Sequence, residues 1–328
     1  MRKLTLQNKL HFKSRSVYQA KARRKKRVRK RSHAVQSFVA TRVKCPDYFM
    51  LKPEYCEDVL DFIGLIKKNA AKGRSVNVNM RNIVEIGEGA ISMLLSVLEE
   101  TKEKGVAVFG SLPSNPIPRG IVERSGFLNY ANTAASNRKS TKNLILKTGD
   151  ASTRQSILKP QIRNAMKTVW GVDGRNPLVY GCVFEMMRNS VDHAFKTKSQ
   201  TKWHWSVSHD DQNKSVKFSF VDNGKGLITT FKQGLLKKVF HFFKDNIDVV
   251  ETAYKDGIAS RTGLSWRGKG LPTIFETFKD NYINNLVVIT NDVYIDFENG
   301  IRKKLKNSFD GTYYYWTVDQ SCVRACFT

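Results

Sequence analysis

The second half of this 328-residue chain contains its most informative segment, Glu185-Met186-Met187-Arg188-Asn189-Ser190-Val191-Asp192-His193-Ala194. Taken alone, it predicts an amphipathic helix with a few polar residues. Residues four apart lie on one face of a helix, so Glu185 and Asn189 are expected to point the same way. A carboxylate and an amide at this spacing can act together at one metal-phosphate centre.

Three further motifs follow at the boundaries of predicted elements. Asp222-Asn223-Gly224-Lys225-Gly226 closes an apolar strand-like run, and Arg267-Gly268-Lys269-Gly270-Leu271 opens a helical segment. Gly311-Thr312 then leads into a second strand-like run, 313–318. Each motif alone is common in turns, but the four together in this order are far more specific. Neither a Rossmann glycine pattern after a strand nor a Walker A P-loop is present.

In their order and placement these motifs resemble the GHKL ATPase superfamily, which includes gyrase, MutL, sensor histidine kinases and anti-sigma-factor serine kinases. The resemblance covers roughly residues 160–328 and implies a Bergerat-fold α+β sandwich that binds ATP and Mg²⁺. It implies that Asn189 holds Mg²⁺ against the phosphates, and that Glu185 is the general base for attack on the γ-phosphate.

The resemblance also assigns the other ATP-binding residues. It makes Asp222 the acceptor for the adenine amino group, beside Thr312, and it lets the backbone at Gly224 and Gly226 approach the ligand. The helix that opens near residue 270 would offer free N–H groups to phosphate. The remaining candidates lie at the start of this helix, near the general base Glu185, or in the expected ATP lid at 227–266. They are Asp192, His193, Arg261, Arg267, Gly268, Lys269, Gly270 and Leu271.

Residues 45–131 alternate between helical and strand-like patterns, with helices expected at 54–68, 89–104 and 117–124, a strand at 74–80 and a short buried strand at 106–109. This stretch resembles a STAS domain, the fold of anti-sigma-factor antagonists, through the turn at 86–90 and through 125–128. A generic small α/β domain is the alternative. Glu88 occupies the place of a phosphorylatable Ser or Thr, either as a carboxylate that the helix dipole stabilises or as a fixed phosphate mimic.

Two segments complete the expected α/β organisation. Residues 132–159 are rich in Ser, Thr, Asn and Lys, and they read as a linker with one short strand at 144–146, before an ATP-binding domain at 160–328. Residues 1–44 hold sixteen Lys or Arg and no acidic residue, so they carry +16 of the formal +27 charge and predict a disordered or helical tail.

The tail is the electrostatic footprint of a polyanion binder, because counterion release gives nucleic-acid affinity without sequence readout. A solubilising tail, an anionic membrane surface and a nuclear-import signal are the alternatives. The residues expected to contact nucleic acid form the densest run: Arg23, Arg24, Lys25, Lys26, Arg27, Arg29, Lys30 and Arg31.

Compartment and function follow from the remaining observations. There is no apolar run of membrane-helix length, no signal-peptide pattern and no Cys-x-x-Cys among five cysteines, which indicates a reduced, cytoplasmic setting without a membrane partner. The expected function is a Mg²⁺·ATP-binding regulatory switch, with slow hydrolysis, that acts on a regulated protein partner. A serine/threonine protein kinase of the anti-sigma-factor type and a non-catalytic nucleic-acid-binding module remain the alternatives.

Overall fold

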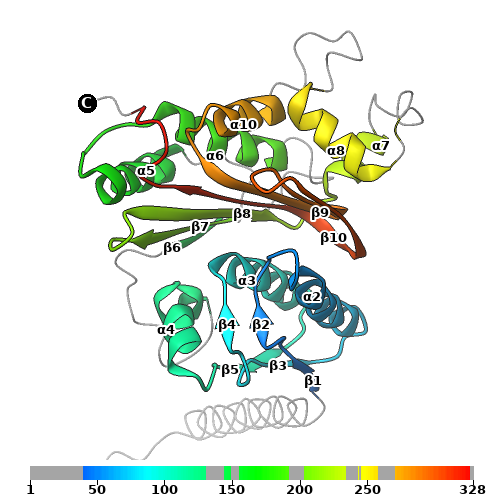
Figure 1. The fold of residues 1–328 in the computed structure, drawn as a ribbon. Helices are drawn as coiled ribbons and strands as arrows, with labels where there is room; N and C mark the ends of the chain where they lie inside the picture. Colours follow the sequence, from blue (N-terminus) through cyan, green and yellow to red (C-terminus); the bar gives the residue numbers. More distant parts are fainter. Residues whose placement is uncertain are drawn as a thin grey trace, which may run out of the picture.

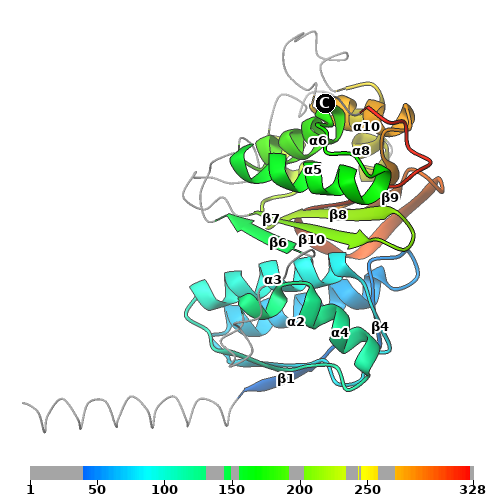
Figure 2. The ribbon, with the colours of Figure 1, turned by 90° about the vertical axis from the view of Figure 1, so that its left-hand side faces the viewer.

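The computed structural model describes residues 40–130, 144–148, 155–191, 203–233, 243, 245–257 and 270–325. These residues form an α/β protein in which a parallel α/β region is followed by an antiparallel sheet with helices (Figure 1). Helices and sheets alternate in four layers, helix, sheet, helix and sheet, as two views at right angles show (Figure 2). The antiparallel sheet is therefore covered on both faces.

The first region contains two small parallel sheets. Strands β1 (Thr41–Lys44), β3 (Val76–Asn79) and β5 (Val108–Ser111) form one sheet in the order β1-β3-β5. Strands β2 (Tyr48–Phe49) and β4 (Glu85–Ile86) form the other. The strand predicted at 106–109 is present as β5, but it begins two residues later, and the prediction that it is buried is wrong, because its residues are half-buried or exposed at the edge of the sheet.

Three helices and a short 3-10 turn, η1 (Phe127–Asn129), complete the first region. Helix α2 (Cys56–Ala71) buries one stripe at intervals of three and four residues, as its apolar pattern predicts. Helix α3 (Glu88–Glu103) is buried nearly all round over residues 89–97, because it lies between the two layers of strands. Helix α4 (Pro116–Arg124) begins after Asn115, whose side chain accepts a hydrogen bond from the Ile117 N–H.

The second region is built on a five-stranded antiparallel sheet in the order β6-β7-β8-β10-β9. Its strands are β6 (Leu144–Thr148), β7 (Trp203–Asp210), β8 (Ser215–Asp222), β9 (Asn284–Asp296) and β10 (Ile301–Val318). Its helices are α5 (Gln155–Trp170), α6 (Pro177–Asn189), α7 (Leu227–Gln233), α8 (Asn246–Lys255) and α10 (Gly270–Lys279). Part of the expected linker thus belongs to this region, since β6 pairs with β7 and α5 begins at Gln155.

Alternate residues of the sheet point into two different cores. Tyr314 and Trp316 of β10 lie in the core under α5, α6, α8 and α10, where Trp316 stacks on Phe218 of β8 with ring centroids 5.2 Å apart. Tyr313, next to Tyr314 in the sequence, lies in a second core that α2 and α3 complete. Because side chains alternate between the faces of a strand, a single strand contributes to both cores.

Polar contacts join α3 to the antiparallel sheet along one face of the helix. The Ser96 hydroxyl donates to Asn223 Oδ1 at 3.1 Å, and His204 Nε2 lies 2.8 Å from Glu99 Oε2 in a buried pair. Ser208 donates to Glu88 Oε1 at 3.1 Å. Gly89 leaves space for Tyr313, whose hydroxyl and ring occupy the position that a Cβ would take. The two regions are therefore packed as one body.

A search for membrane-crossing helices within the described residues finds none of sufficient length and hydrophobicity.

Candidate functional site

Three of the sequence motifs meet where α6 ends and α10 begins. Glu185 and Asn189 lie one turn apart on α6, which confirms the prediction that they share a helix. A Cβ built on Gly270, the first residue of α10, would lie 2.5 Å from Glu185 Oε2 and 3.5 Å from Asn189 Oδ1. Glycine at this position therefore leaves room for both side chains against the start of α10.

This cluster combines groups that suit a metal-bound phosphate. Asn189 Nδ2 is buried and has no hydrogen-bond partner among the described residues. Glu185 is partly exposed, with Oε1 3.8 Å from Arg188 Nη1. The start of α10 adds backbone N–H groups that have no partner within their own helix, where the helix dipole also favours an anion. A buried amide without a partner is the kind of group that a ligand can satisfy.

Asp222 is the second element of the site, at the end of β8. Its carboxylate is only 3% exposed and accepts hydrogen bonds from Ser190 Oγ and the Gly224 N–H, each at 2.8 Å. The Thr312 backbone N–H also hydrogen-bonds to it, consistent with the pairing of the two residues in the sheet. Burial nevertheless raises the pKa of Asp222 to about 6, because the three donors offset only part of the desolvation cost.

Ser190 connects the two elements. It follows Asn189 directly, and its hydroxyl lies within hydrogen-bond distance of both the Met186 carbonyl and the Asp222 carboxylate. Asn189 and Asp222 are thus held beside one another, although 33 residues separate them in the sequence. The sequence motifs did not identify Ser190 as a site residue. Its position directly after Asn189 is the sequence feature that could have done so.

The glycine loop after Asp222 is held by two residues of β9 that the sequence did not indicate. Gly226 has φ +76°, and a Cβ there would collide with the Asn291 side chain. Asn291 accepts a hydrogen bond from the Ile228 N–H at 3.0 Å and donates one to the Lys225 carbonyl at 3.0 Å. Thr290 Oγ1 accepts from the Leu227 N–H and donates to the Gly311 carbonyl. The second and fourth motifs are therefore tied together through β9.

Two buried tyrosines add hydroxyls beside Asp222 and Asn189. Burial raises the pKa of Tyr254 on α8 and of Tyr314 on β10. The Asn189 and Tyr254 side chains approach the Tyr314 hydroxyl, but neither tyrosine hydroxyl makes a well-formed hydrogen bond within the described part of the chain. No sequence signal separated these tyrosines from ordinary core aromatics.

The other predicted site residues fall into two groups. Leu271 has its side chain in the core, so only its backbone is available to a ligand at the start of α10. Thr312 is buried, and its hydroxyl lies 3.5 Å from Thr290 Oγ1. The basic run at 23–31 lies outside the described residues, as do the following six: Asp192, His193, Arg261, Arg267, Gly268 and Lys269.

Asn189 is the residue of this cluster best placed to hold a metal ion. The described residues contain no group of three or more His, Cys, Asp or Glu that could form a complete metal site. Mg²⁺ does not require one, because it commonly binds one or two protein oxygens together with water and phosphate oxygens. The residues present therefore fit a Mg²⁺ ion that arrives with a phosphate ligand.

No protein-family model matches the chain, and no curated protein matches it.

Proposed function

We propose that the chain is a Mg²⁺·ATP-binding switch of the GHKL type, with a Bergerat-fold second region and a STAS-like first region. The observation that carries the proposal is that Glu185 and Asn189 lie against Gly270. The residue after Asn189, Ser190, donates a hydrogen bond to the buried Asp222 carboxylate. These groups come from three separate motifs, and packing alone does not require a buried carboxylate with a raised pKa.

Each group has a role in binding the nucleotide. Asp222 accepts a hydrogen bond from the adenine amino group, with Thr312 beside it in the sheet. Asn189 offers its amide oxygen to Mg²⁺, and the start of α10 offers N–H groups to the phosphates. The hydroxyls of Tyr254 and Tyr314 are further donors on the base side of the site, where a ligand would satisfy them.

Glu185 is the residue assigned to the chemical step. Its carboxylate is the acidic group next to Asn189 and the start of α10, and it is exposed enough to reach a water molecule. It orients this water and accepts its proton during attack on the γ-phosphate. Mg²⁺, when bound, neutralises charge that develops on the phosphates.

Contacts between α3 and the sheet provide a route from the nucleotide to the first region. Asn223, next to Asp222, accepts a hydrogen bond from Ser96 of α3. Glu88, at the place of the phospho-acceptor, accepts one from Ser208 of β7. Both contacts support a role for the STAS-like region as a built-in element of the switch, which presents the nucleotide state to a regulated protein partner.

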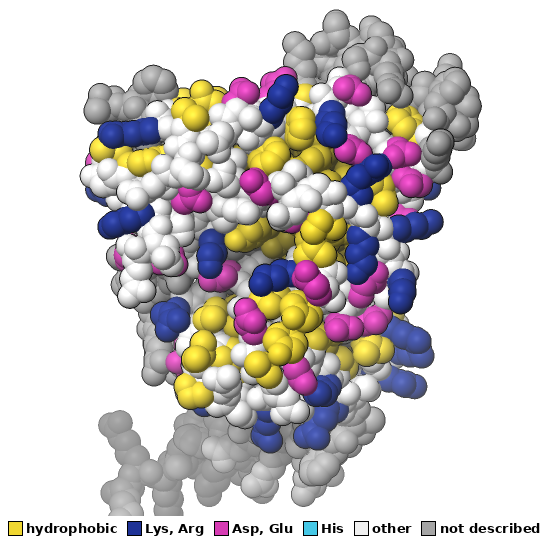
Figure 3. Space-filling view, in the orientation of Figure 1, with side chains coloured by type: hydrophobic (Ala, Val, Ile, Leu, Met, Phe, Trp, Pro, Cys, Tyr) yellow, Lys and Arg dark blue, Asp and Glu magenta, His cyan; other side chains and the backbone are white. Residues whose placement is uncertain are grey.

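Nucleic acid remains the proposed partner of the basic tail. The charge of residues 1–44 supports this assignment, since it amounts to +16 without any acidic residue. Among the described residues, basic side chains are interspersed with acidic and hydrophobic ones over both halves of the face in Figure 3. The tail is therefore the segment best suited to dominate binding to a polyanion.

Single-turnover hydrolysis with Glu185→Gln tests the proposal. We expect hydrolysis to fall by about 100-fold or more, the range for loss of a general base, while Mg²⁺·ATP affinity in calorimetry changes little. Glu276→Gln, at an exposed position of α10, is the matched control and should keep wild-type activity.

Three results would change the assignment. Failure of the wild-type chain to bind Mg²⁺·ATP would contradict the proposal altogether. Unchanged hydrolysis in Glu185→Gln would remove the catalytic role and leave a non-catalytic module. Labelled phosphate transferred from ATP to serine or threonine of another protein would favour the kinase alternative, because kinases of this type use the same site.

A further inference from the structure

A separate cavity lies at the other end of α6, between α5 and the loop that leads into α6. Its volume is about 300 Å³, at the lower end of the range for small-molecule sites. Pro177 and Tyr180 of α6 line the cavity, and Glu185 lies eight and five residues after them, so it is about 8–12 Å from these lining residues along the helix. The cavity is therefore distinct from the proposed nucleotide site.

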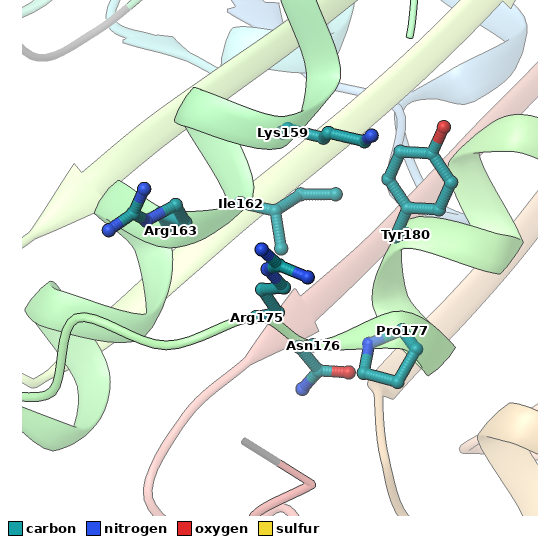
Figure 4. Close-up of a pocket in the computed structure, with 7 residues that line it drawn as sticks. All are labelled: Lys159, Ile162, Arg163, Arg175, Asn176, Pro177 and Tyr180. Carbon is teal, nitrogen blue, oxygen red and sulfur yellow. The ribbon is translucent and has the colours of Figure 1, made fainter. Parts of the chain in front are cut away.

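The floor of the cavity is apolar. Ile162 is buried at its centre, and the rings of Pro177 and Tyr180 form one side (Figure 4). The Tyr180 ring is held in place by stacking on Phe184, with ring centroids 6.1 Å apart. A floor of this kind suits a flat ring or a short hydrocarbon chain, whose burial there is favourable.

The rim is cationic. Lys159 and Arg163 come from α5, Arg175 comes from the loop, and none of the described residues that line the cavity is acidic. Figure 4 shows Lys159 extending across the cavity towards Tyr180, and the Arg175 guanidinium directed into the space beside Ile162. These two cations thus come from separate elements to the same apolar depression.

Arg163 differs from these two cations because its charge is already matched. Its Nε lies 2.7 Å from Asp173 Oδ1, and Lys167 lies 2.9 Å from the other oxygen. These contacts, first with Lys167 and then with Arg163, lower the pKa of Asp173. Within the described part of the chain, neither Lys159 nor Arg175 forms an ion pair. Two uncompensated cations therefore face the apolar floor.

We infer that this cavity binds a small organic anion with an apolar body, such as an aromatic or aliphatic carboxylate, sulfonate or phosphate. The two free cations recognise the anionic group, and the floor formed by Ile162, Pro177 and Tyr180 takes the apolar body. A nucleic-acid backbone suits the site poorly, because its phosphates and sugars offer nothing to an apolar floor.

Calorimetry and ligand-observed NMR with naphthalene-2-sulfonate test this inference on the full chain. We expect a Kd of about 1 mM or tighter, the scale for a ligand of this size. Neutral 2-naphthalenemethanol should bind about tenfold more weakly, because it lacks the charge that Lys159 and Arg175 recognise. Equal binding of the two compounds, or no binding of the sulfonate, would overturn the inference.

Variants locate the probe. The double variant Lys159→Gln/Arg175→Gln should weaken sulfonate binding about tenfold or more. Lys167→Gln, which removes an exposed cation of the same helix outside the cavity, should leave it unchanged. All three positions of change are on the surface, and an unaltered urea midpoint confirms that the fold is retained. Unchanged binding in the double variant would refute the site.

One further comparison separates this inference from the proposed function. Asp222→Asn should not change the affinity for naphthalene-2-sulfonate, because Asp222 lies at the far end of α6. Loss of sulfonate binding in that variant would place the probe in the nucleotide site and overturn the second site. Failure of ATP binding with retained sulfonate binding would instead contradict the proposed function alone.

Discussion

Asp222→Asn should make the protein more stable at neutral pH and weaken ATP binding at the same time. The side chain keeps its shape but loses its charge in a buried position. Burial raises the pKa of Asp222 from 3.8 to about 6, a shift of roughly two units. At about 1.4 kcal/mol per unit, ionisation of this carboxylate costs the folded state about 3 kcal/mol.

The pH dependence follows from this shift. The folded state binds the Asp222 proton more tightly than the unfolded chain does, so this carboxyl stabilises the fold most below pH 3.8. Its contribution then falls as the pH rises to about 6 and is constant above that value. The neutral amide of the variant does not titrate. The unfolding free energy of the wild type minus that of the variant should therefore fall by about 3 kcal/mol over this interval.

Urea unfolding of both proteins, followed by tryptophan fluorescence between about pH 4 and pH 8, measures this difference directly, because titrations that the two proteins share cancel. Asp210→Asn is the control with the opposite sign. Hydrogen bonds from Asn213, first from its backbone, lower the pKa of Asp210, so its stabilising contribution is lost as the pH falls. A difference for Asp222 that does not change with pH would refute the buried, unfavourable carboxylate.

ATP binding completes this prediction. Loss of a hydrogen bond to a charged group should cost about 1–3 kcal/mol of binding free energy, measured by calorimetry at pH 8, where Asp222 is ionised. A variant that gains stability but loses affinity shows that the carboxylate is kept for binding and not for the fold. Equal ATP affinity in the two proteins would contradict the assignment of Asp222 to the base.

Two further predictions concern the rest of the chain. Gly89→Ala should lower the unfolding free energy in urea by about 1–3 kcal/mol, because its methyl group would collide with Tyr313. Gly64→Ala in α2, where nothing lies within 4 Å, should instead raise it by about 0.5–1 kcal/mol, and similar effects at the two sites would argue against the packed interface. Deletion of residues 1–34 should leave ATP binding intact while removing most of the salt-dependent affinity for nucleic acid in fluorescence anisotropy titrations; superimposable titrations of the two chains would exclude the tail as the binding segment.

The local parts of the fold were predictable because their signals are local. Helix α2 was expected at 54–68 and lies at Cys56–Ala71, since apolar residues recur at intervals of three and four along it. The sequence also indicated the strand that ends at Asp222 and the helix that carries Glu185 and Asn189. Turn residues and hydrophobic periodicity determine such elements over a few residues, whatever the distant contacts are.

Elements that depend on distant pairing were not predictable in this way. Strand β10 runs over Ile301–Val318, but its first part is rich in Lys and Arg and becomes a strand by pairing with β9. Thr290 and Asn291 hold the glycine loop because the register of β9 brings them there. Asn291 also has a positive φ, 50°, which its identity alone does not reveal.

The covering of the sheet on both faces has a signal in the sequence. Residues 313–316 are large aromatic residues at both alternating sets of positions, whereas a strand with one face in water alternates with polar residues. Tyr314 and Trp316 face the upper helices, while Tyr313 faces α2 and α3. Continuous apolar character in an antiparallel strand was therefore evidence for a second packed layer.

Because of this two-sided packing, the proposed nucleotide site and the first region both contact the end of β8. Asp222 receives a hydrogen bond from Ser190 just beyond α6, and the next residue, Asn223, receives one from Ser96 of α3. Under the proposed function, a ligand that moves Asp222 must also disturb Asn223, because one peptide bond joins them. Coupling between binding sites is reciprocal. If a partner that shifts α3 changes nucleotide affinity, the nucleotide must change affinity for that partner by the same factor.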